Sequence, residues 1–117
     1  MKPTRPTRWH SNRQEKKIAK AVGGKKTPNS GAGLWKKGDV MTDSGWLFEA
    51  KTKMEESKSF TIKREWIEKN KEEAFAMGKD YNALVIDFGD GKQFYLLDEK
   101  TFLRMKNYLE EAENEDS

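Results

Sequence analysis

The segment from residue 38 to residue 51 constrains the fold most strongly, because it has the pattern of a β-hairpin. Asp39 ends a loop or opens a short strand, residues 43–45 (Asp-Ser-Gly) have turn composition, and residues 46–52 form the returning strand. A hairpin of this kind brings the chain back beside its own first strand. The spacing therefore predicts that Asp39 lies next to Glu49.

The returning strand divides its side chains into two sets, because successive residues of a strand point to opposite faces of a sheet. Glu49 and Lys51 share one face, whereas Trp46, Phe48 and Ala50 share the other. Two carboxylates, counting the one from the first strand, and one ammonium group are therefore expected to converge at one place.

These groups suit a hard divalent cation. Mg²⁺ takes oxygen ligands, usually one or two carboxylates together with waters and a substrate phosphate. The bound ion can polarise a phosphoryl oxygen, and a neighbouring lysine can orient the attacking water. The alternative is a surface hairpin with a Glu–Lys pair. Glu49-x-Lys51 taken alone favours that alternative, so the case for a functional site depends on the surrounding segments.

Composition limits the class of protein. A chain of 117 residues with 34% apolar and 37% charged residues forms one domain with a modest core. Cysteine is absent, so the sequence has neither disulfides nor thiolate metal sites. No run of 18 apolar residues and no secretory leader is present, which predicts a protein with no membrane partner in an intracellular, reducing compartment.

Charge is distributed unevenly along the chain. Up to Lys37 there are eleven Lys or Arg residues against the single acid Glu15, and the acids gather at the end of the chain. A basic first third indicates a polyanionic partner, most often nucleic acid, or else a solvated basic arm. The organisation expected is a flexible basic arm at 1–10, one domain at 11–110 and a disordered acidic tail at 111–117.

A first helix is predicted to begin with the capping box at residues 11–14 and to end near Val22, before two glycines. Its apolar stripe includes Ile18, and the same stripe extended back by one turn reaches Glu15. Two interpretations of this acid are equally supported. Glu15 either lies in a solvated first turn, where the helix dipole favours it, or is a third acid directed at the pair of carboxylates.

The segment from Lys25 to Lys37 is predicted to be a loop that contacts phosphate. It contains two glycines, the hydroxyl of Ser30 and four lysines. It has no Walker motif. A plain linker is the alternative, but such a linker would be unusually basic and glycine-rich.

The rest of the chain predicts two helices and a second hairpin. Thr61 caps a helix over residues 62–77, with Lys63 in its first turn, where the helix dipole disfavours a cation. Lys63 either binds phosphate near the carboxylates or is a solvated lysine, and Lys63 taken alone favours the second interpretation. The apolar run at 83–88 predicts a strand covered on both faces, and residues 93–97 its partner. Asp98 caps a last amphipathic helix. The fold class predicted is α/β, or else α+β, with a mixed central β-sheet flanked by helices.

At this point the residues resemble a known family. An early helical Glu15, the Ser30-Gly-Ala-Gly loop, Gly38-Asp39-Val and Glu49-Ala-Lys51 are similar to the motifs of the PD-(D/E)xK nuclease superfamily, and most similar to those of archaeal-type and phage Holliday junction resolvases. The resemblance covers about residues 11–88 and implies a restriction-endonuclease-like core. Gly38 stands where the signature has proline.

The resemblance implies a role for each matching residue. Asp39 and Glu49, with the Ala50 carbonyl, would bind Mg²⁺ or Mn²⁺, and Lys51 would position the water or stabilise the phosphorane. Glu15 would hold a metal-bound water or a second ion, and Ser30 would contact the scissile phosphate. The residues expected to bind DNA are Arg8, Arg13, Lys25, Lys26, Ser30, Lys36, Lys37 and Lys63.

The implied function is a magnesium-dependent, structure-selective endonuclease that acts as a homodimer on four-way DNA junctions in recombination and repair. The implied setting is the cytoplasm of a bacterium, an archaeon or a phage-infected host. Two alternatives stay open: a nuclease of this superfamily that cuts flaps, nicked or foreign duplex, or a DNA-binding module without catalysis. The acidic C-terminus leaves DNA contact to the N-terminal arm and the 25–37 loop.

Overall fold

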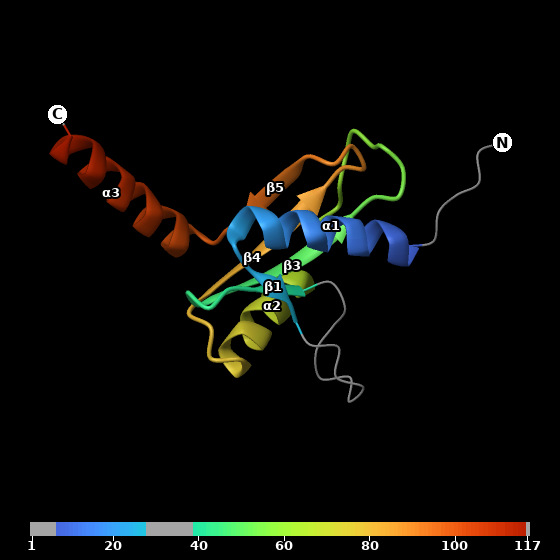
Figure 1. Cartoon of the computed structure of the whole chain (residues 1–117), viewed down its shortest axis with the longest axis horizontal. Coiled ribbons are helices and arrows are strands. Elements are labelled where there is room, and N and C mark those ends of the chain that lie inside the picture. Colours follow the sequence, from blue (N-terminus) through green and yellow to red (C-terminus); the bar gives the residue numbers. More distant parts are fainter. Residues whose placement is uncertain (1–6, 28–38, 117) are drawn as a thin grey trace.

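A computed structural model of the chain describes residues 7–27 and 39–116 (Figure 1). Its helices and strands, in chain order, are α1 Thr7–Val22, β1 Lys25–Lys26, β2 Asp39–Met41, β3 Trp46–Thr52, α2 Arg64–Ala76, β4 Tyr81–Asp87, β5 Gln93–Leu96 and α3 Glu99–Glu115.

The strands form one mixed sheet in the order β1-β2-β3-β4-β5. Neighbouring strands are antiparallel except β3 and β4, which are parallel and joined by the crossover helix α2. Helix α1 packs on one face, since Ile18 contacts Phe48, and α2 lies on the other, where Trp66 meets Lys51 (Figure 1). The mixed central sheet with flanking helices is confirmed.

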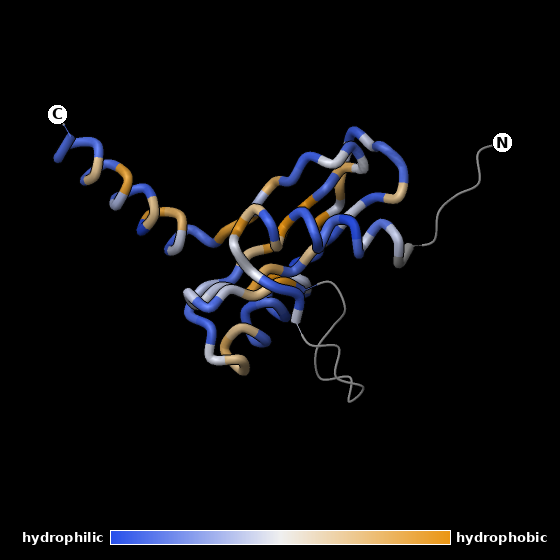
Figure 2. Tube along the Cα trace, in the orientation of Figure 1, coloured by the Kyte–Doolittle hydropathy of each residue, from blue (hydrophilic) through white to orange (hydrophobic). Residues whose placement is uncertain are grey.

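The core lies between α1 and the centre of the sheet. Ile18, Val40, Phe48, Ala83 and Val85 are each at most 5% exposed and pack together. The alternate residues of β4, which face α2, are buried as well. Strand β4 is thus covered on both faces, as its continuous apolar run predicts, and it stands out in orange in Figure 2.

The first hairpin has the predicted form. Strand β3 spans residues 46–52, and Gly45 in the turn has a φ of 101°, which glycine adopts without strain. The Thr42 hydroxyl accepts hydrogen bonds from the Trp46 amide at 3.1 Å and the Ser44 hydroxyl at 2.9 Å. These contacts fix the turn and, with it, the pairing of β2 with β3.

The N-terminal part of the domain differs from the prediction. Helix α1 begins at Thr7 rather than after a cap at Ser11, so residues 7–10 are helical and are not part of a flexible arm. The Arg13 guanidinium lies 5.4 Å from the centre of the Trp9 ring, one turn away along the helix. This contact favours a helix that begins before the predicted capping box.

Two other boundaries also differ. Lys25 and Lys26 were predicted to lie in a loop, but they form β1 against β2. Gly24 permits this close pairing, because a Cβ there would stand 2.6 Å from the Met41 carbonyl oxygen. Helix α2 begins at Arg64, with Lys63 as its N-cap and without a side-chain cap, so Lys63 precedes the first turn.

Helix α3 begins as predicted, because the Asp98 carboxylate accepts a hydrogen bond from the Thr101 amide at 2.8 Å. The helix continues to Glu115, however, so the acidic segment predicted to be disordered is helical through that residue. Glutamate and alanine are good helix formers, and the apolar residues of the preceding turns keep helical spacing into this segment.

A buried glutamine joins α1 to the sheet. Gln14 is 2% exposed. Its amide nitrogen lies 2.9 Å from the Lys51 carbonyl, 3.1 Å from the Val85 carbonyl and 3.0 Å from the Gln93 side-chain oxygen. One side chain thus connects α1 with β3, β4 and β5.

We predict that Gln14→Ala lowers the free energy of unfolding by about 2 kcal/mol, because it leaves buried carbonyl groups without their donor. Urea denaturation measures the change. The control is Lys16→Ala at an exposed position of the same helix, which should change stability by less than about 0.5 kcal/mol. Equal stability of the two variants would contradict this account of how α1 is attached.

Candidate active site

Two buried carboxylates stand opposite each other on β2 and β3. Asp39 and Glu49 are directly paired in the antiparallel register, as the hairpin pattern predicts. They are 1% and 3% exposed. Because directly opposed residues share a face, both side chains lie on the face of the sheet that carries α2.

Lys51 belongs to the same face. Its ammonium group lies 3.8 Å from a Glu49 carboxylate oxygen and 4.5 Å from the centre of the Trp66 ring on α2. Its backbone carbonyl is held from the opposite side of the sheet by Gln14. Lys51 is thus positioned by one helix through its side chain and by the other through its main chain.

A second lysine also lies near Trp66. The Lys63 ammonium lies 5.9 Å from the centre of the same indole ring, so the N-terminus of α2 and β3 each direct a lysine at Trp66. Lys63 was predicted to bind phosphate near the carboxylates. The structure brings Lys63 to the ring that holds Lys51.

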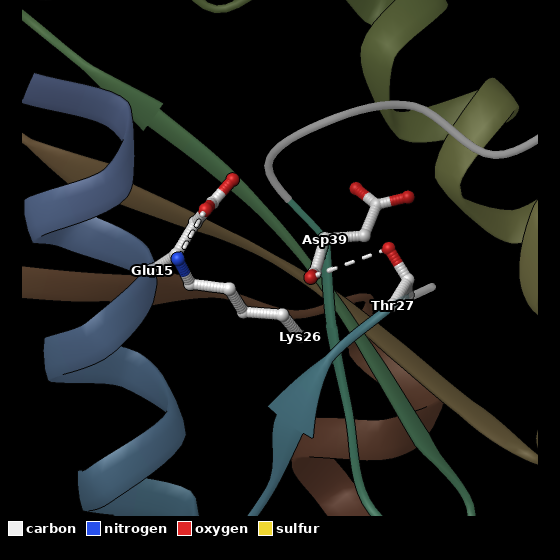
Figure 3. A network of polar contacts seen from close by, with 4 residues as sticks. All are labelled: Glu15, Lys26, Thr27 and Asp39. Atoms are coloured by element: carbon white, nitrogen blue, oxygen red, sulfur yellow. Dashed lines mark hydrogen bonds and ion pairs between the residues drawn. The ribbon is translucent and has the colours of Figure 1, made fainter. Parts of the chain in front are cut away.

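Glu15 lies on the other side of the sheet. It is 5% exposed, and its carboxylate is 3.5 Å from the Lys26 ammonium (Figure 3). Figure 3 shows the Asp39 carboxylate directed away from this pair. Glu15 is therefore buried and not solvated. It contacts Lys26 of β1 and is not directed at the pair of carboxylates, so neither of the two interpretations is confirmed.

Burial raises the pKa of the Glu15 carboxyl above its ordinary value of 4.5, and the charge and hydrogen bond of Lys26 oppose this rise. A buried acid with a raised pKa is the kind of group found at functional sites and in structural ion pairs alike.

Lys26 at the end of β1 and Thr27 directly after it contact Glu15 and the main chain of Asp39, respectively. The Thr27 amide donates to the Asp39 backbone carbonyl at 3.0 Å, and the Thr27 hydroxyl reaches the same oxygen at 3.5 Å (Figure 3). Lys26, the preceding residue, holds Glu15. The main chain of Asp39 is therefore fixed by the segment that positions Glu15, although the two carboxylates point apart.

The donor set fits a hard cation. Within residues 7–27 and 39–116, no group of three or more His, Cys, Asp or Glu side chains is arranged to hold a metal ion. Mg²⁺ requires only one or two carboxylates, completed by waters and substrate phosphate. Asp39 and Glu49 supply two carboxylates from adjacent strands, and the Ala50 carbonyl lies between Glu49 and Lys51 in the chain.

The residues predicted to bind DNA occupy several elements. Arg8 and Arg13 belong to α1, Lys25 and Lys26 form the exposed strand β1, and Lys63 is the exposed N-cap of α2. The other three predicted residues fall outside the described part of the chain: Ser30, Lys36 and Lys37.

Two residues that shape the site are not among the predicted ones. Gln14 belongs to the predicted capping box, and Trp66 falls within the helix predicted over residues 62–77 without a role of its own. A polar side chain next to Glu15 on the inward side of α1 was the available signal for Gln14. The role of Trp66 depends on how α2 crosses β3, which the sequence does not specify.

The chain matches no model of a known protein family, no curated protein and no solved structure. Among the helices of the described residues, none combines the length and the apolar character needed to cross a membrane.

We predict that replacing Glu15 with Gln makes the protein relatively more stable as pH rises. The folded protein keeps a proton on Glu15 that the unfolded chain has already lost, so this group lowers stability as pH rises from 4.5 through the raised pKa. The difference in unfolding free energy, variant minus wild type, should therefore grow from about pH 4 to pH 7.

Urea denaturation across this pH range measures the difference. Glu72→Gln at an exposed position of α2 is the matched control and should give a flat difference. A flat profile for Glu15→Gln too, or one of opposite slope, would contradict the assignment of a raised pKa.

Proposed function

We propose that this protein is a magnesium-dependent, structure-selective DNA endonuclease, with the four-way junction as its substrate. The observation that carries the proposal is the cross-strand pair of Asp39 and Glu49, with Lys51 on the same face and 3.8 Å from Glu49. The resemblance to PD-(D/E)xK nucleases requires an acid on one strand and Glu-x-Lys on the next. Asp39, Glu49 and Lys51 have this spacing, and their side chains lie on one face of the sheet.

The fold is compatible with a restriction-endonuclease-like core. Helix α1 comes first, the β2–β3 hairpin carries the acids, and α2 crosses over to a parallel β4 beside β3. This order gives the acids one face of a mixed sheet, next to the N-terminal end of α2.

Each side chain then has a chemical task. Asp39 and Glu49, with the Ala50 carbonyl, hold the cation. When bound, Mg²⁺ or Mn²⁺ polarises the scissile phosphate and lowers the pKa of water. The Lys51 ammonium, anchored against Trp66, orients the attacking water and offsets charge that develops on the phosphate. Lys63 binds a neighbouring phosphate of the strand.

Glu15 acts from the opposite side of the sheet. Because its carboxylate pairs with Lys26, its direct partner is a cation of β1. In the proposed enzyme Glu15 sets the position of Lys26, which contacts the DNA backbone. Because Glu15 lies across the sheet from Asp39 and Glu49, the proposed cation site does not include it.

Two other functions remain as alternatives. A nuclease of the same chemistry could act on flaps, nicked or foreign duplex, because the same site serves any phosphodiester. A non-catalytic DNA-binding module would need the lysines but not the buried acids. The pairing of two buried acids with Lys51 favours a catalytic site over the last alternative.

The test is cleavage of a labelled four-way junction beside linear duplex, flap and single strand, with Mg²⁺ and with EDTA. We expect paired, symmetric nicks in the junction alone, and none with EDTA. Cutting of all substrates would retain the nuclease and exclude junction selectivity. Binding without any cutting would overturn the proposal.

Substitutions in the site should separate chemistry from binding. We predict that Asp39→Asn, Glu49→Gln and Lys51→Ala each reduce single-turnover cleavage by about a hundredfold or more, as loss of a preorganised charged group does. Junction affinity should change little. The control is Asp43→Asn in the exposed turn of the same hairpin, which should cut at the wild-type rate. Wild-type cleavage by any of the three site variants would remove that residue from the site.

Lys63 should contribute one phosphate contact. We predict that Lys63→Ala lowers the slope of log affinity against log salt by about 0.9 on duplex arms, the value for one lost contact on B-DNA. Lys100→Ala, an exposed lysine at the start of α3, is the control and should leave the slope unchanged. An unchanged slope for Lys63→Ala would place the DNA elsewhere.

A further inference from the structure

Helix α3 projects from the sheet, with its C-terminal end far from the other elements (Figure 1). None of its residues is buried. Its first turns are tied to the domain through Arg104, whose guanidinium lies 5.7 Å from the centre of the Tyr81 ring. The helix is therefore anchored at its start, and the other described residues leave the rest of its length uncovered.

The uncovered length carries an apolar seam. Phe102, Met105, Leu109 and Ala112 follow spacings of three, four and three residues, which is the pattern of a coiled-coil interface. Phe102, Met105 and Leu109 are 54%, 49% and 61% exposed, and apolar residues recur along this helix in Figure 2. Arg104 lies on the opposite side of the helix from Phe102, so the contact with Tyr81 leaves the seam open.

Charge along α3 is polarised. The first half contains three cations, Lys100, Arg104 and Lys106, against one acid, Glu99, whereas the second half contains four glutamates, Glu110, Glu111, Glu113 and Glu115. Acids in the last turn oppose the helix dipole, and the last turn has no basic residue. A favourable partner would bring positive charge and a helix N-terminus to this acidic end.

We propose that α3 pairs antiparallel with α3 of a second copy of this chain, giving a two-fold symmetric dimer. In this arrangement the basic half of each helix lies beside the acidic half of its partner. The apolar sizes also match, because Phe102 faces Ala112 of the partner subunit and Met105 faces Leu109 of the partner subunit. This arrangement supplies the surface for the dimer included in the proposed function, but it rests on α3 alone and not on nuclease activity.

A parallel pair is disfavoured, since it would set four glutamates of one helix against the same four of the other. A second docking place for α3 exists on the molecule. It is the open apolar groove beside β5, whose lining includes Phe60, Ile62, Phe88 and Phe94. The groove offers no basic side chain among its lining residues to meet the acidic half of α3, so the charge pattern favours helix against helix.

The first test is the mass of the full chain in solution by light scattering after gel filtration. We expect twice the chain mass of 13.6 kDa. Leu109→Glu should weaken the dimer by about a hundredfold or more, because the substitution occurs twice in a symmetric interface. The control is Leu103→Glu, an exposed leucine outside the seam, which should stay dimeric. Phe94→Lys in the groove should stay dimeric too.

A wild-type protein that is monomeric at about 100 μM, a concentration far above the dissociation constant of a specific dimer, would overturn the proposal. Loss of the dimer in Phe94→Lys but not in Leu109→Glu would assign the interface to the groove instead. Circular dichroism of each variant checks that it is folded. All three variants are expected to fold, because the three positions are exposed.

The second test fixes the direction of the pair. The chain has no cysteine, so single cysteines can be introduced at positions 102 and 112. An antiparallel pair predicts that a mixture of Phe102→Cys and Ala112→Cys forms a disulfide-linked heterodimer, while each variant alone stays uncrosslinked. Cross-linking of each variant with itself would indicate a parallel pair and contradict the proposal, because a disulfide needs Cα atoms within about 7 Å.

Discussion

The pairing of β2 with β3 is the constraint on which the rest of the structure depends. In this register Val40 and Phe48 lie under α1 and form the core, while Asp39 and Glu49 lie on the face of α2. A slip of one residue would exchange these sets, placing acids in the core and an aromatic ring in the site. The same interaction therefore specifies both the hydrophobic core and the arrangement of the acids.

The register of β2 and β3 buries the carboxylates of Asp39 and Glu49. Side chains of the helices on both faces of the sheet hold the neighbouring Lys51 in place. Gln14 of α1 holds the main chain of Lys51, and Trp66 of α2 holds its ammonium group. Charged groups buried in this way are tolerated only where partners are fixed around them. Glu15 shows that burial disfavours a charged carboxylate, because burial raises the pKa of this group even though the Lys26 ammonium lies beside it.

Local patterns predicted the local elements. The period of two and the turn at 43–45 placed β3 and the pairing of Asp39 with Glu49, and the apolar run placed β4. Features that depend on distant parts of the chain were not predictable. Helical periodicity placed Glu15 on the apolar stripe of the first helix, but it left open whether the acid is buried and did not specify the sheet face that α1 covers. The amphipathic pattern of the last helix predicted that it has an apolar face but not that Phe102 and Leu109 on this face stay exposed.

The central claim is that Asp39 and Glu49 form one cation site, and the binding of Mn²⁺ to the protein without DNA, followed by electron paramagnetic resonance, tests it most directly. We predict one Mn²⁺ site per chain, from which Mg²⁺ displaces the Mn²⁺. The site should be lost in both Asp39→Asn and Glu49→Gln and kept in Glu15→Gln, because Glu15 lies across the sheet. Retention of that site in Glu49→Gln, or its loss in Glu15→Gln alone, would contradict the account.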